Sequence, residues 1–276
     1  MQQHLILPFV LASFMKTCTG TNWCYQSQEN CTSPCNGPEM WPIADKACDG
    51  KAQSPINIVH RKTLTDKRLT PLQFENYQNS FESLIQNIGH YVQVTLPHNA
   101  SVIGGDLEMP YKAVQFHLHW GNKGGPGSEH TIDGEQYPME ESPRDNRKYD
   151  PIVKALQSIV KPGTNTSLGA VSLEQLIPSQ QNLTKFYRYR GSLTTPGCTE
   201  SVIWTVFENP IPLSKEQLEV FSNLQFKDGK PMVATFRPVQ PLNGRKVYRS
   251  GGAVVLASTT LLVASIAMAM GLSQPN

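Results

Sequence analysis

The sequence predicts a mainly β fold of the α+β class, in which helices lie at the periphery of the strands. Two observations predict it. The 276 residues include 20 Gly and 21 Pro, and a chain so rich in turn residues favours a strand-rich fold over a helical bundle. Residues 114–120 alternate strictly between apolar and polar side chains, which is the period of a β-strand. The length that remains between the two terminal segments suits a single domain.

Further elements are predicted in chain order around that strand. Segments 51–59 and 84–96 are expected to be extended, because they hold β-branched residues and the second alternates in polarity over one or two strands. Residues 151–160 have helical spacing with Pro151 in the first turn, and 173–177 form a short helix before Pro178. Residues 200–207 are predicted to be a buried strand. A helix over 214–224 opens with Ser214 as N-cap and Gln217 three residues later.

The two ends of the chain indicate a secreted, membrane-attached protein. Residues 1–20 contain a short apolar run followed by small residues, which is the pattern of a signal peptide. The tail 251–276 has no charged side chain, and its first 22 residues are long enough to span a bilayer. Arg245, Lys246 and Arg249 precede the tail and no basic residue follows it, which favours a removable GPI-attachment signal. The polar spacer of such a signal is nearly absent, so a single-pass membrane helix stays the alternative.

Charge excludes one large class of partners. Charged residues make up 17% of the chain, and 24 Lys+Arg against 22 Asp+Glu give a net charge of +2 with no basic run. The sequence therefore predicts no nucleic-acid partner, because such binding needs a basic patch that follows the phosphates. In the secretory pathway, Asn-x-Ser/Thr sequons become candidate glycan sites, and they lie at Asn30, Asn99, Asn165 and Asn182.

Six cysteines define the redox chemistry. Cys18 is expected to leave with the signal peptide, so five remain, and an oxidising compartment then predicts two disulfides and one thiol. Spacing alone leaves the pairing open. A metal site at Cys24, Cys31 and Cys35 is the disfavoured alternative, because extracellular thiols pair with one another.

His117 and His119 form the candidate metal site. They are two residues apart on the predicted strand, so both imidazoles leave the same face and their ring nitrogens can converge on one metal ion. Spacing alone also fits two ordinary polar residues on a solvated sheet face.

Several motifs, in order, closely resemble those of the α-type carbonic anhydrases. The resemblance runs from about Trp23 to Val247, and the Trp23-Cys24-Tyr25 start with the two terminal segments resembles the membrane-anchored, type IV members. The motifs are Gln53-Ser54-Pro55-Ile56-Asn57-Ile58, Asn87-Ile88-Gly89-His90, Trp120-Gly121, Gly127-Ser128-Glu129-His130-Thr131, Gly191-Ser192-Leu193-Thr194-Thr195-Pro196-Gly197-Cys198 and Arg237-Pro238-Val239-Gln240-Pro241-Leu242.

The resemblance implies a fold, an activity and a location. The fold would be a large, twisted, mostly antiparallel central sheet with peripheral helices, spanning residues 21–250 as a monomer. The activity would be zinc-dependent, reversible hydration of carbon dioxide to bicarbonate at the extracellular face of the plasma membrane. Zinc lowers the pKa of its bound water to about 7 in the carbonic anhydrases, the standard example of this chemistry, so that hydroxide attacks the substrate at neutral pH.

The same resemblance implies roles for individual residues. His117 and His119 match two zinc ligands, and Gln115 matches the residue that orients His117. Thr194 matches the hydroxyl that accepts a hydrogen bond from zinc-bound hydroxide and passes its own proton toward Glu129. The remaining matches are Thr195 at the bicarbonate position, Leu193 on the apolar wall, His90 as proton shuttle, His130 as a buried structural residue, Glu140 as the carboxylate that orients the third ligand, and disulfides Cys48–Cys198 and Cys24–Cys35, which leave Cys31 over.

One departure puts the activity in doubt. After Glu140 the family continues into two further strands, one of which carries the third His ligand, whereas here Glu141-Ser142-Pro143 follows at once. The seven His residues lie at 4, 60, 90, 98, 117, 119 and 130, so no third His ligand exists downstream. The resemblance therefore implies a fold without two central strands, as after a skipped exon or an internal deletion.

Two interpretations of the function follow. The first is a carbonic anhydrase by family whose activity is reduced or absent, with Glu140 or Glu141 as the candidate third ligand. The second is a catalytically silent, related product that lacks the third zinc ligand, either a metal-poor binding or interaction protein or a chain that never folds. Unpaired strand edges where two strands are absent would be a folding and aggregation liability.

Overall fold

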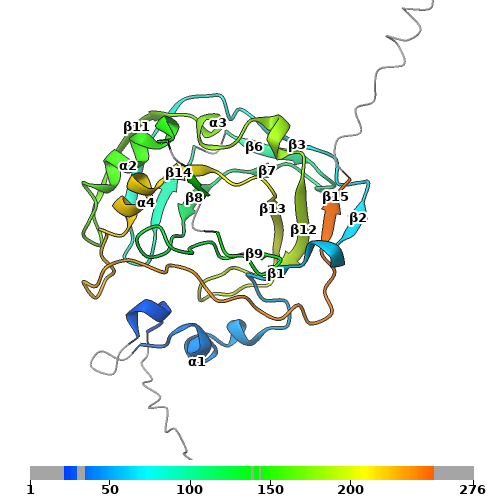
Figure 1. Cartoon of the computed structure of the whole chain (residues 1–276), viewed down its shortest axis with the longest axis horizontal. Helices are drawn as coiled ribbons and strands as arrows, with labels where there is room; N and C mark the ends of the chain where they lie inside the picture. Colours follow the sequence, from blue (N-terminus) through cyan, green and yellow to red (C-terminus); the bar gives the residue numbers. More distant parts are fainter. Residues whose placement is uncertain (1–21, 30–34, 98, 138–139, 143, 252–276) are drawn as a thin grey trace, which may run out of the picture.

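The first sheet in the computed structural model carries the candidate metal ligands. The structure describes residues 22–29, 35–97, 99–137, 140–142 and 144–251. Four antiparallel strands form this sheet in the order β11-β4-β5-β8 (Figure 1). The segment 84–96, expected to hold one or two strands, contains β5 and the end of β4, which begins three residues earlier, and β8 is the strand expected within 114–120. The bounds are β4 Phe81–Asn87, β5 Val92–Thr95, β8 Gln115–Leu118 and β11 Asn165–Val171.

A tight turn joins β4 to β5 and fixes their register. Gly89 has φ +89°, a left-handed conformation that favours glycine. The buried side chain of Asn87 accepts a hydrogen bond from the Gly89 amide at 2.8 Å and donates to three carbonyl oxygens. Because every polar group of this amide is satisfied, Asn87 can remain in the interior beneath the turn.

The second sheet lies on the other side of the fold. Its order is β13-β12-β15-β2, with β12 antiparallel to both of its neighbours and β15 parallel to β2. Five of the six residues of β12 are buried, whereas every residue of β13 is half-buried. The predicted burial of 200–207 is therefore wrong, because β13 is the terminal strand of its sheet within the described residues. The bounds are β2 Leu64–Asp66, β12 Phe186–Gly191, β13 Val202–Phe207 and β15 Tyr248–Ser250.

The two four-stranded sheets end on strands that face the same cavity. Strand β8 ends the first sheet and β13 ends the second, and neither has a second partner strand among the described residues. A cavity of about 650 Å³ is lined by residues of both strands, which lie across the interior from one another in Figure 1. The single large sheet of the expected fold is thus divided, and the mainly β, mostly antiparallel architecture is confirmed.

Three smaller sheets complete the strand content of the described residues. β3, β6 and β7 form an antiparallel sheet, while β1 with β9 and β10 with β14 form parallel pairs. The expected extended segment 51–59 contributes only the short strand β1. The bounds are β1 Asn57–Ile58, β3 Leu72–Glu75, β6 Ser101–Gly104, β7 Tyr111–Lys112, β9 Thr131–Ile132, β10 Glu140–Ser142 and β14 Pro212–Ser214.

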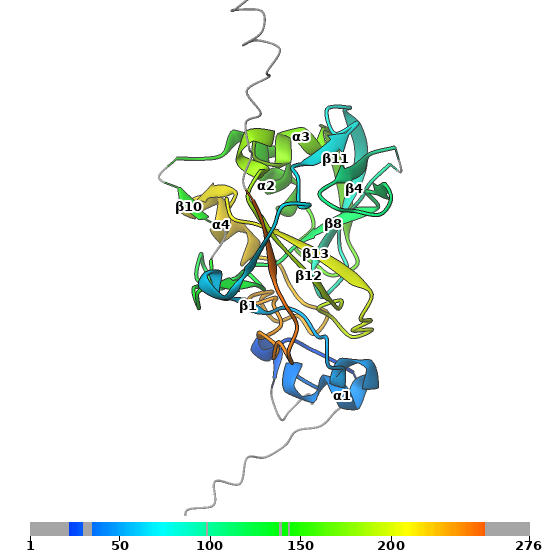
Figure 2. The same cartoon turned by 90° about the vertical axis from the view of Figure 1, so that its right-hand side faces the viewer.

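Short helices cover the periphery, as Figures 1 and 2 show. The three helices expected from sequence are present, although α2 and α4 end a few residues before the predicted limits. Capping boxes open α3, through Ser172 and Gln175, and α4, through Ser214 and Gln217, which satisfies amide groups that a helix start leaves free. Helix α2 contacts β11 and α4. The bounds are α1 Trp41–Ala44, α2 Asp150–Leu156, α3 Leu173–Leu176 and α4 Lys215–Phe221, with 3₁₀ turns at Gln26–Gln28, Pro38–Met40, Lys46–Asp49, His60–Lys62, Arg147–Tyr149 and Gln180–Leu183.

The N-terminal segment with α1 lies at one end of the molecule, below the sheets in Figures 1 and 2. One disulfide lies within this segment and a second fastens it to the rest of the fold. Cys24 is joined to Cys35, and Cys48 is joined to Cys198 in the connection between β12 and β13. Both predicted pairings are confirmed, and no cysteine in the described part of the chain is free. Cys18 and Cys31 lie outside the described residues.

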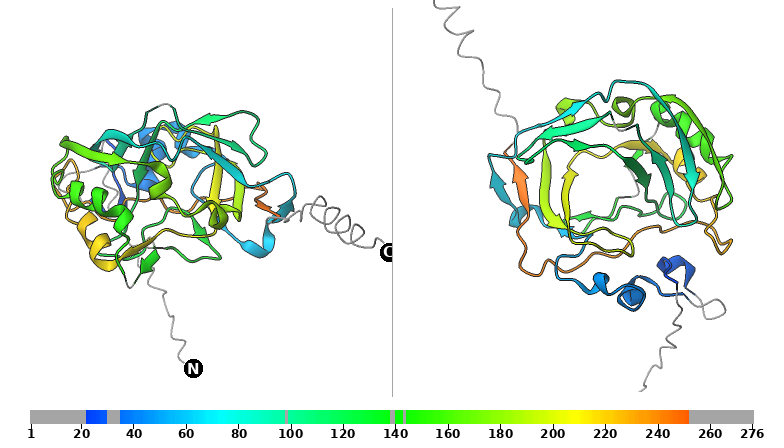
Figure 3. Two further views of the ribbon diagram at one scale, coloured as in Figure 1. Left: turned by 90° about the horizontal axis from the view of Figure 1, so that it is seen from above. Right: turned by 180° about the vertical axis from the view of Figure 1, so that it is seen from behind.

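The two ends of the described chain leave the membrane predictions untested. The signal peptide 1–20 and all of the tail 251–276 except Gly251 lie outside the described residues. Among the residues that are described, no helix is both long and apolar enough to cross a bilayer. The last described strand, β15, pairs with β2 at the margin of the second sheet, and Figure 3 shows this margin from above and from behind.

Candidate metal centre

Strand β8 presents two imidazoles at the edge of the first sheet. His117 pairs with Gln93 in the register of β5, and His119 follows just after the strand ends. Alternation along the strand puts both side chains on the same face. Their ring centroids are 5.0 Å apart, so the predicted pair is brought together.

Gln115 sets the orientation of His117. Its Oε1 lies 3.0 Å from Nδ1 of His117, and an amide oxygen can only accept. Nδ1 therefore carries the proton, and Nε2 is left with a lone pair. Burial, and next the charge of His119, lower the pKa of His117 to about 4, so the ring is neutral at pH 7. A neutral imidazole with a free Nε2 is the form that binds a metal ion.

His119 is held by a backbone contact that sequence reasoning missed. Its Nδ1 donates to the carbonyl oxygen of Thr235, and the Thr235 hydroxyl accepts from the amide of Trp120 at 3.0 Å. The Nε2 of His119 is buried and has no hydrogen-bond partner among the described residues. An orphaned ring nitrogen beside His117 is the feature expected of a metal ligand.

Glu129 faces His119 from the segment before β9. Its Oε2 lies 3.5 Å from Nε2 of His119, and the side chains are only 12% exposed for His119 and 7% for Glu129. Oε1 of Glu129 accepts a hydrogen bond from the amide of Arg237 at 3.2 Å. The guanidinium of Arg237 donates instead to the side-chain oxygen of Gln53 and to the carbonyls of Cys48 and Ser54.

His130 has a structural environment, as expected. Its Nε2 lies 2.6 Å from the Tyr189 hydroxyl, and its ring packs on Trp204 with centroids 4.7 Å apart. Desolvation, with a smaller effect from the charge of His119, lowers the pKa of His130 to about 4. The ring is therefore neutral at pH 7 and is joined to the second sheet.

The other predicted site residues lie in two separate places. Thr194 is buried, Thr195 is half-buried and Leu193 is 48% exposed, all in the connection from β12 to β13. Among the described residues no hydrogen bond joins Glu129 to Thr194, so the proton relay between these two side chains stays a prediction. His90 lies in the β4–β5 turn, where its ring stacks on Trp23 at 4.0 Å. Burial, followed by the charge of Lys227, lowers the pKa of His90.

The donor set fits only part of a zinc site. Two imidazoles are correctly presented, yet no group of three His, Cys, Asp or Glu side chains in the described part of the chain could hold a metal ion. Catalytic zinc needs three protein ligands and an open position. Glu140 lies in β10, where its backbone pairs with Pro212 of β14. The structure describes only the backbone of Glu140 and Glu141. The residues present therefore do not complete the predicted zinc centre.

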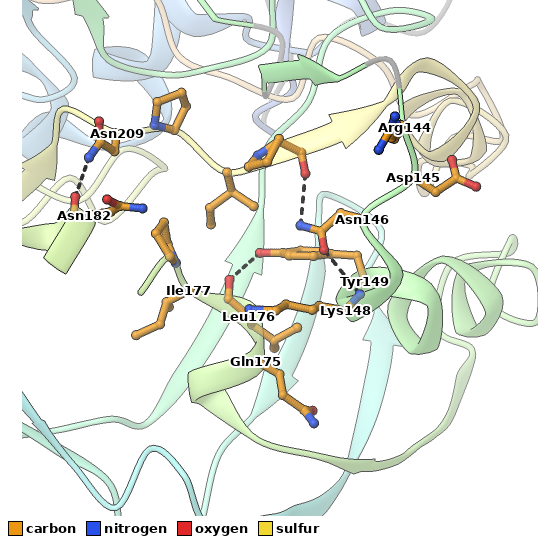
Figure 4. A pocket seen from close by; sticks show the side chains of 14 residues that line it. Arg144, Asp145, Asn146, Lys148, Tyr149, Gln175, Leu176, Ile177, Asn182 and Asn209 are labelled. Carbon is orange, nitrogen blue, oxygen red and sulfur yellow. Dashed lines mark hydrogen bonds between the residues drawn. The ribbon is translucent and has the colours of Figure 1, made fainter. Parts of the chain in front are cut away.

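The cavity beside the imidazoles was also missed from sequence, because it depends on which strands lack a neighbour. It opens between β8 and β13. A neighbouring cavity of about 410 Å³ shares Tyr149 and Ile177 with it and is shown in Figure 4. There the Tyr149 hydroxyl donates to the carbonyl of Leu176 at 2.6 Å, and Asn209 donates to the carbonyl of Asn182 at 2.6 Å. These contacts hold the wall between the two cavities.

Comparison with known proteins decides the family. The sequence model of the eukaryotic-type carbonic anhydrases matches residues 36–142 and 140–251 of this chain. The chain belongs to the carbonic anhydrase family. Carbonic anhydrase 4 of Mus musculus is 38% identical, with 96% of this chain and 97% of the relative covered. Carbonic anhydrase 4 of Rattus norvegicus is 36% identical with the same coverage, and carbonic anhydrase 15 of Mus musculus is 34% identical over 87% of this chain and 86% of the relative.

The comparisons also place the missing segment. The family match falls into two pieces that meet at residues 140–142, the junction identified from sequence. The alignment with the rat carbonic anhydrase spans 302 positions, more than the 276 residues of the whole chain, so the relative holds residues that this carbonic anhydrase lacks. By family the chain is a carbonate dehydratase, an enzyme of carbon dioxide hydration, with an internal segment absent after Glu140.

Proposed function

We propose that this carbonic anhydrase is catalytically silent or strongly impaired, because its sequence holds no third His ligand downstream of His117 and His119. The observation that carries the proposal is the pairing of His117 and His119 without a third metal-binding side chain among the described residues. Zinc held by two imidazoles binds weakly and lacks the three-ligand geometry that catalytic zinc requires. The roles that the resemblance assigns to the other site residues then describe the reaction of the family and not a reaction of this chain.

Several features of the family site are retained, and they support descent from an active enzyme. Gln115 and the carbonyl of Thr235 each fix the tautomer of one imidazole, which is what a metal ligand needs. Thr194 remains buried beside the half-buried Thr195. The side-chain oxygen of Gln115 and the carbonyl of Thr235 contact Nδ1 of His117 and His119, respectively, so neither group occupies an Nε2 atom.

The test is zinc content together with carbon dioxide hydration. The chain is purified as its host cell processes it, and rat carbonic anhydrase 4 is treated identically as the positive control. We expect far less than one zinc per chain and a hydration rate lower by about a hundredfold or more. One tightly held zinc per chain with sulfonamide-sensitive turnover would defeat the silent assignment and favour an active enzyme with a carboxylate as third ligand.

The gene offers an independent check of the missing segment. A coding exon between codons 140 and 141, which encodes two strands and a His ligand, would identify this chain as a splice product. An uninterrupted reading frame across the two codons would identify a deletion fixed in the gene. Both results are compatible with loss of the ligand, and they differ in whether a complete enzyme is also made.

We also propose that the chain is anchored to the extracellular face of the plasma membrane through a GPI lipid. The support is the uncharged, largely apolar segment 251–276 with Arg249 on its N-terminal side. Sequons Asn99, Asn165 and Asn182 lie at exposed positions, where glycans can be attached. Release of the protein from cells by a phosphatidylinositol-specific phospholipase is expected, whereas protein that stays in the membrane would indicate a single-pass helix.

A further inference from the structure

A cavity of about 670 Å³ lies on the face of the second sheet that points away from the candidate metal centre. Ile203 of β13 lines it, whereas Trp204 and Val206 of the same strand line the cavity beside the imidazoles. Because successive side chains of a strand leave opposite faces, the two cavities are separate, and they share no lining residue. Strands β12 and β15, which pair with one another and lie near β2 in Figure 1, contribute further residues.

The carboxylates that line this cavity are already paired. Arg68 contacts Asp66 at 2.7 Å and Asp106 at 3.6 Å. Arg190 contacts Glu108 at 3.8 Å. Two guanidinium groups of the lining therefore account for all three of its carboxylates.

Three further cations line the cavity and form no ion pair among the described residues. They are Arg188 of β12, Arg245 and Lys246. The guanidinium of Arg245 donates to four backbone carbonyls, which carry no net charge, and Lys246 is exposed. The lining thus holds five cationic side chains against three carboxylates, and this surplus is complementary to an anion.

Arg188 is the buried member of this group, with an exposed fraction of 8%. Its Nε donates to the hydroxyl of Thr205 at 3.1 Å, and its Nη1 donates to the carbonyl of Gly105 at 2.8 Å. Nη2 is buried and has no hydrogen-bond partner among the described residues, and such a donor on a charged group is costly to leave unpaired. Desolvation lowers the pKa of Arg188, and the opposing charge of Asp106 does not cancel this effect. The carboxylates of the protein therefore leave this guanidinium short of negative charge.

We propose that this cavity binds a small molecule that carries a tetrahedral oxyanion, a phosphate or sulfate ester. One oxygen of the ester accepts from Nη2 of Arg188, and Lys246 donates to the oxyanion from the rim. Arginine and lysine are the side chains that proteins use for such groups. Because Nη2 is buried, the ligand reaches it only when side chains of the rim move, and Arg68 and Lys246 there are exposed.

The volume of the cavity and its place in the fold define the ligand further. A volume of about 670 Å³ lies within the usual range for pockets that hold whole small molecules, so there is room for an organic body such as a sugar beside the oxyanion. The cavity contains no residue of the candidate metal centre. Binding is therefore expected to need neither zinc nor carbon dioxide hydration.

The experiment compares three probes that share one body: glucose 6-phosphate, glucose 6-sulfate and glucose. Binding to the protein, purified as its host cell processes it and dialysed against EDTA, is measured by calorimetry in a buffer free of phosphate and sulfate. We expect at least one ester to bind about tenfold or more tightly than glucose, because a hydrogen bond to a charged group is worth that factor. The ester that binds more tightly identifies the oxyanion that the site prefers.

Two variants remove the proposed donors. Arg188→Lys keeps the charge and loses the planar set of donors, so it should weaken binding of the preferred ester by about tenfold. Lys246→Gln should weaken it by about threefold, the effect of losing an exposed ion pair. Lys154→Gln makes the same change at an exposed position of α2 and should leave binding as in the parent protein.

A third variant predicts a gain of binding, which a misfolded protein would not give. Asp106→Asn removes a carboxylate that lines the cavity and repels an incoming anion. Asp106 has φ +62°, a left-handed conformation that Asn also tolerates. We expect the preferred ester to bind about threefold more tightly to this variant. Binding of glucose should stay unchanged.

Three results would overturn the proposal. Equal binding of glucose and both esters would mean that the protein has no site for an oxyanion. An ester preference that is unchanged in Lys246→Gln and in Asp106→Asn would place the oxyanion elsewhere on the molecule. Equal weakening by Lys246→Gln and Lys154→Gln would show a general effect of net charge and not a contact in this cavity.

Discussion

Nε2 of His119 lies 3.5 Å from Oε2 of Glu129, and both side chains are nearly buried. The atom that the family assigns to zinc therefore faces a carboxylate in this chain. Two further groups hold the pair in place, since the carbonyl of Thr235 takes Nδ1 of the ring and the amide of Arg237 takes the other carboxylate oxygen. This arrangement leads to a first prediction about zinc and stability.

Zinc should stabilise this protein only slightly. A ligand at a hundred times its dissociation constant raises the free energy of unfolding by about 2.7 kcal/mol, and a complete three-ligand site reaches that level at low zinc. With two imidazoles we expect a much smaller rise at the same micromolar zinc concentration, and none in His119→Ala. Thermal unfolding with and without zinc measures it. A shift as large as that of rat carbonic anhydrase 4 would mean that a third ligand is present.

The free edge of β13 should promote self-association. All six residues of β13 are half-buried and the strand ends its sheet, so its outer backbone groups can pair with another molecule. Ile203→Lys places a charge on this strand at a half-buried residue and should lower the association measured by light scattering as concentration rises. Val239→Lys, a lysine substitution at a residue that is 44% exposed and outside any strand, is the control. Equal solubility of the two variants would contradict an edge mechanism.

The two disulfides should differ in their contribution to stability. Cys48–Cys198 spans a sequence separation of 150 residues and Cys24–Cys35 a separation of 11. Loop-closure entropy in the unfolded chain then favours the longer link by about 2 kcal/mol. Denaturant unfolding of the two double Cys→Ala variants measures the difference. If both variants lose the same free energy, residual structure in the unfolded chain dominates over loop length.

Acid should destabilise the fold through His130. Its pKa is about 4 in the folded chain against an ordinary value of 6.5, because desolvation disfavours the charged ring. The unfolded chain therefore takes up the proton first, so this contribution is complete above about pH 6.5 and is lost as the pH falls toward 4. The loss amounts to about 2 to 3 kcal/mol.

The variant His130→Gln should flatten the stability profile between these pH values. Tyr189→Phe is the matched control, because it removes the hydroxyl partner of His130 and keeps the titrating ring. We expect this control to lower stability at every pH and to retain the slope. An unchanged slope in His130→Gln would assign acid sensitivity to other groups.

Local sequence features determined much of the fold. Strict alternation predicted β8, a proline in a first turn predicted α2, and the N-cap Ser214 predicted α4, since each feature acts through neighbouring backbone groups. Burial of 200–207 was predicted wrongly, because apolar composition says that a strand can be buried and not whether a neighbouring strand covers it. The disulfide partners came from the family pattern and not from spacing.

The sequence alone also determined the family, the pair His117 and His119 and the missing third ligand, because these are matters of residue identity and order. Only the tertiary structure decided how the rest of the fold is arranged around the missing segment. It divided one sheet into two with β8 and β13 as edges, opened a cavity between them and set Glu129 against His119. The physical reason is that strand pairing and the contacts of Thr235 and Arg237 join residues more than a hundred positions apart, which no local pattern encodes.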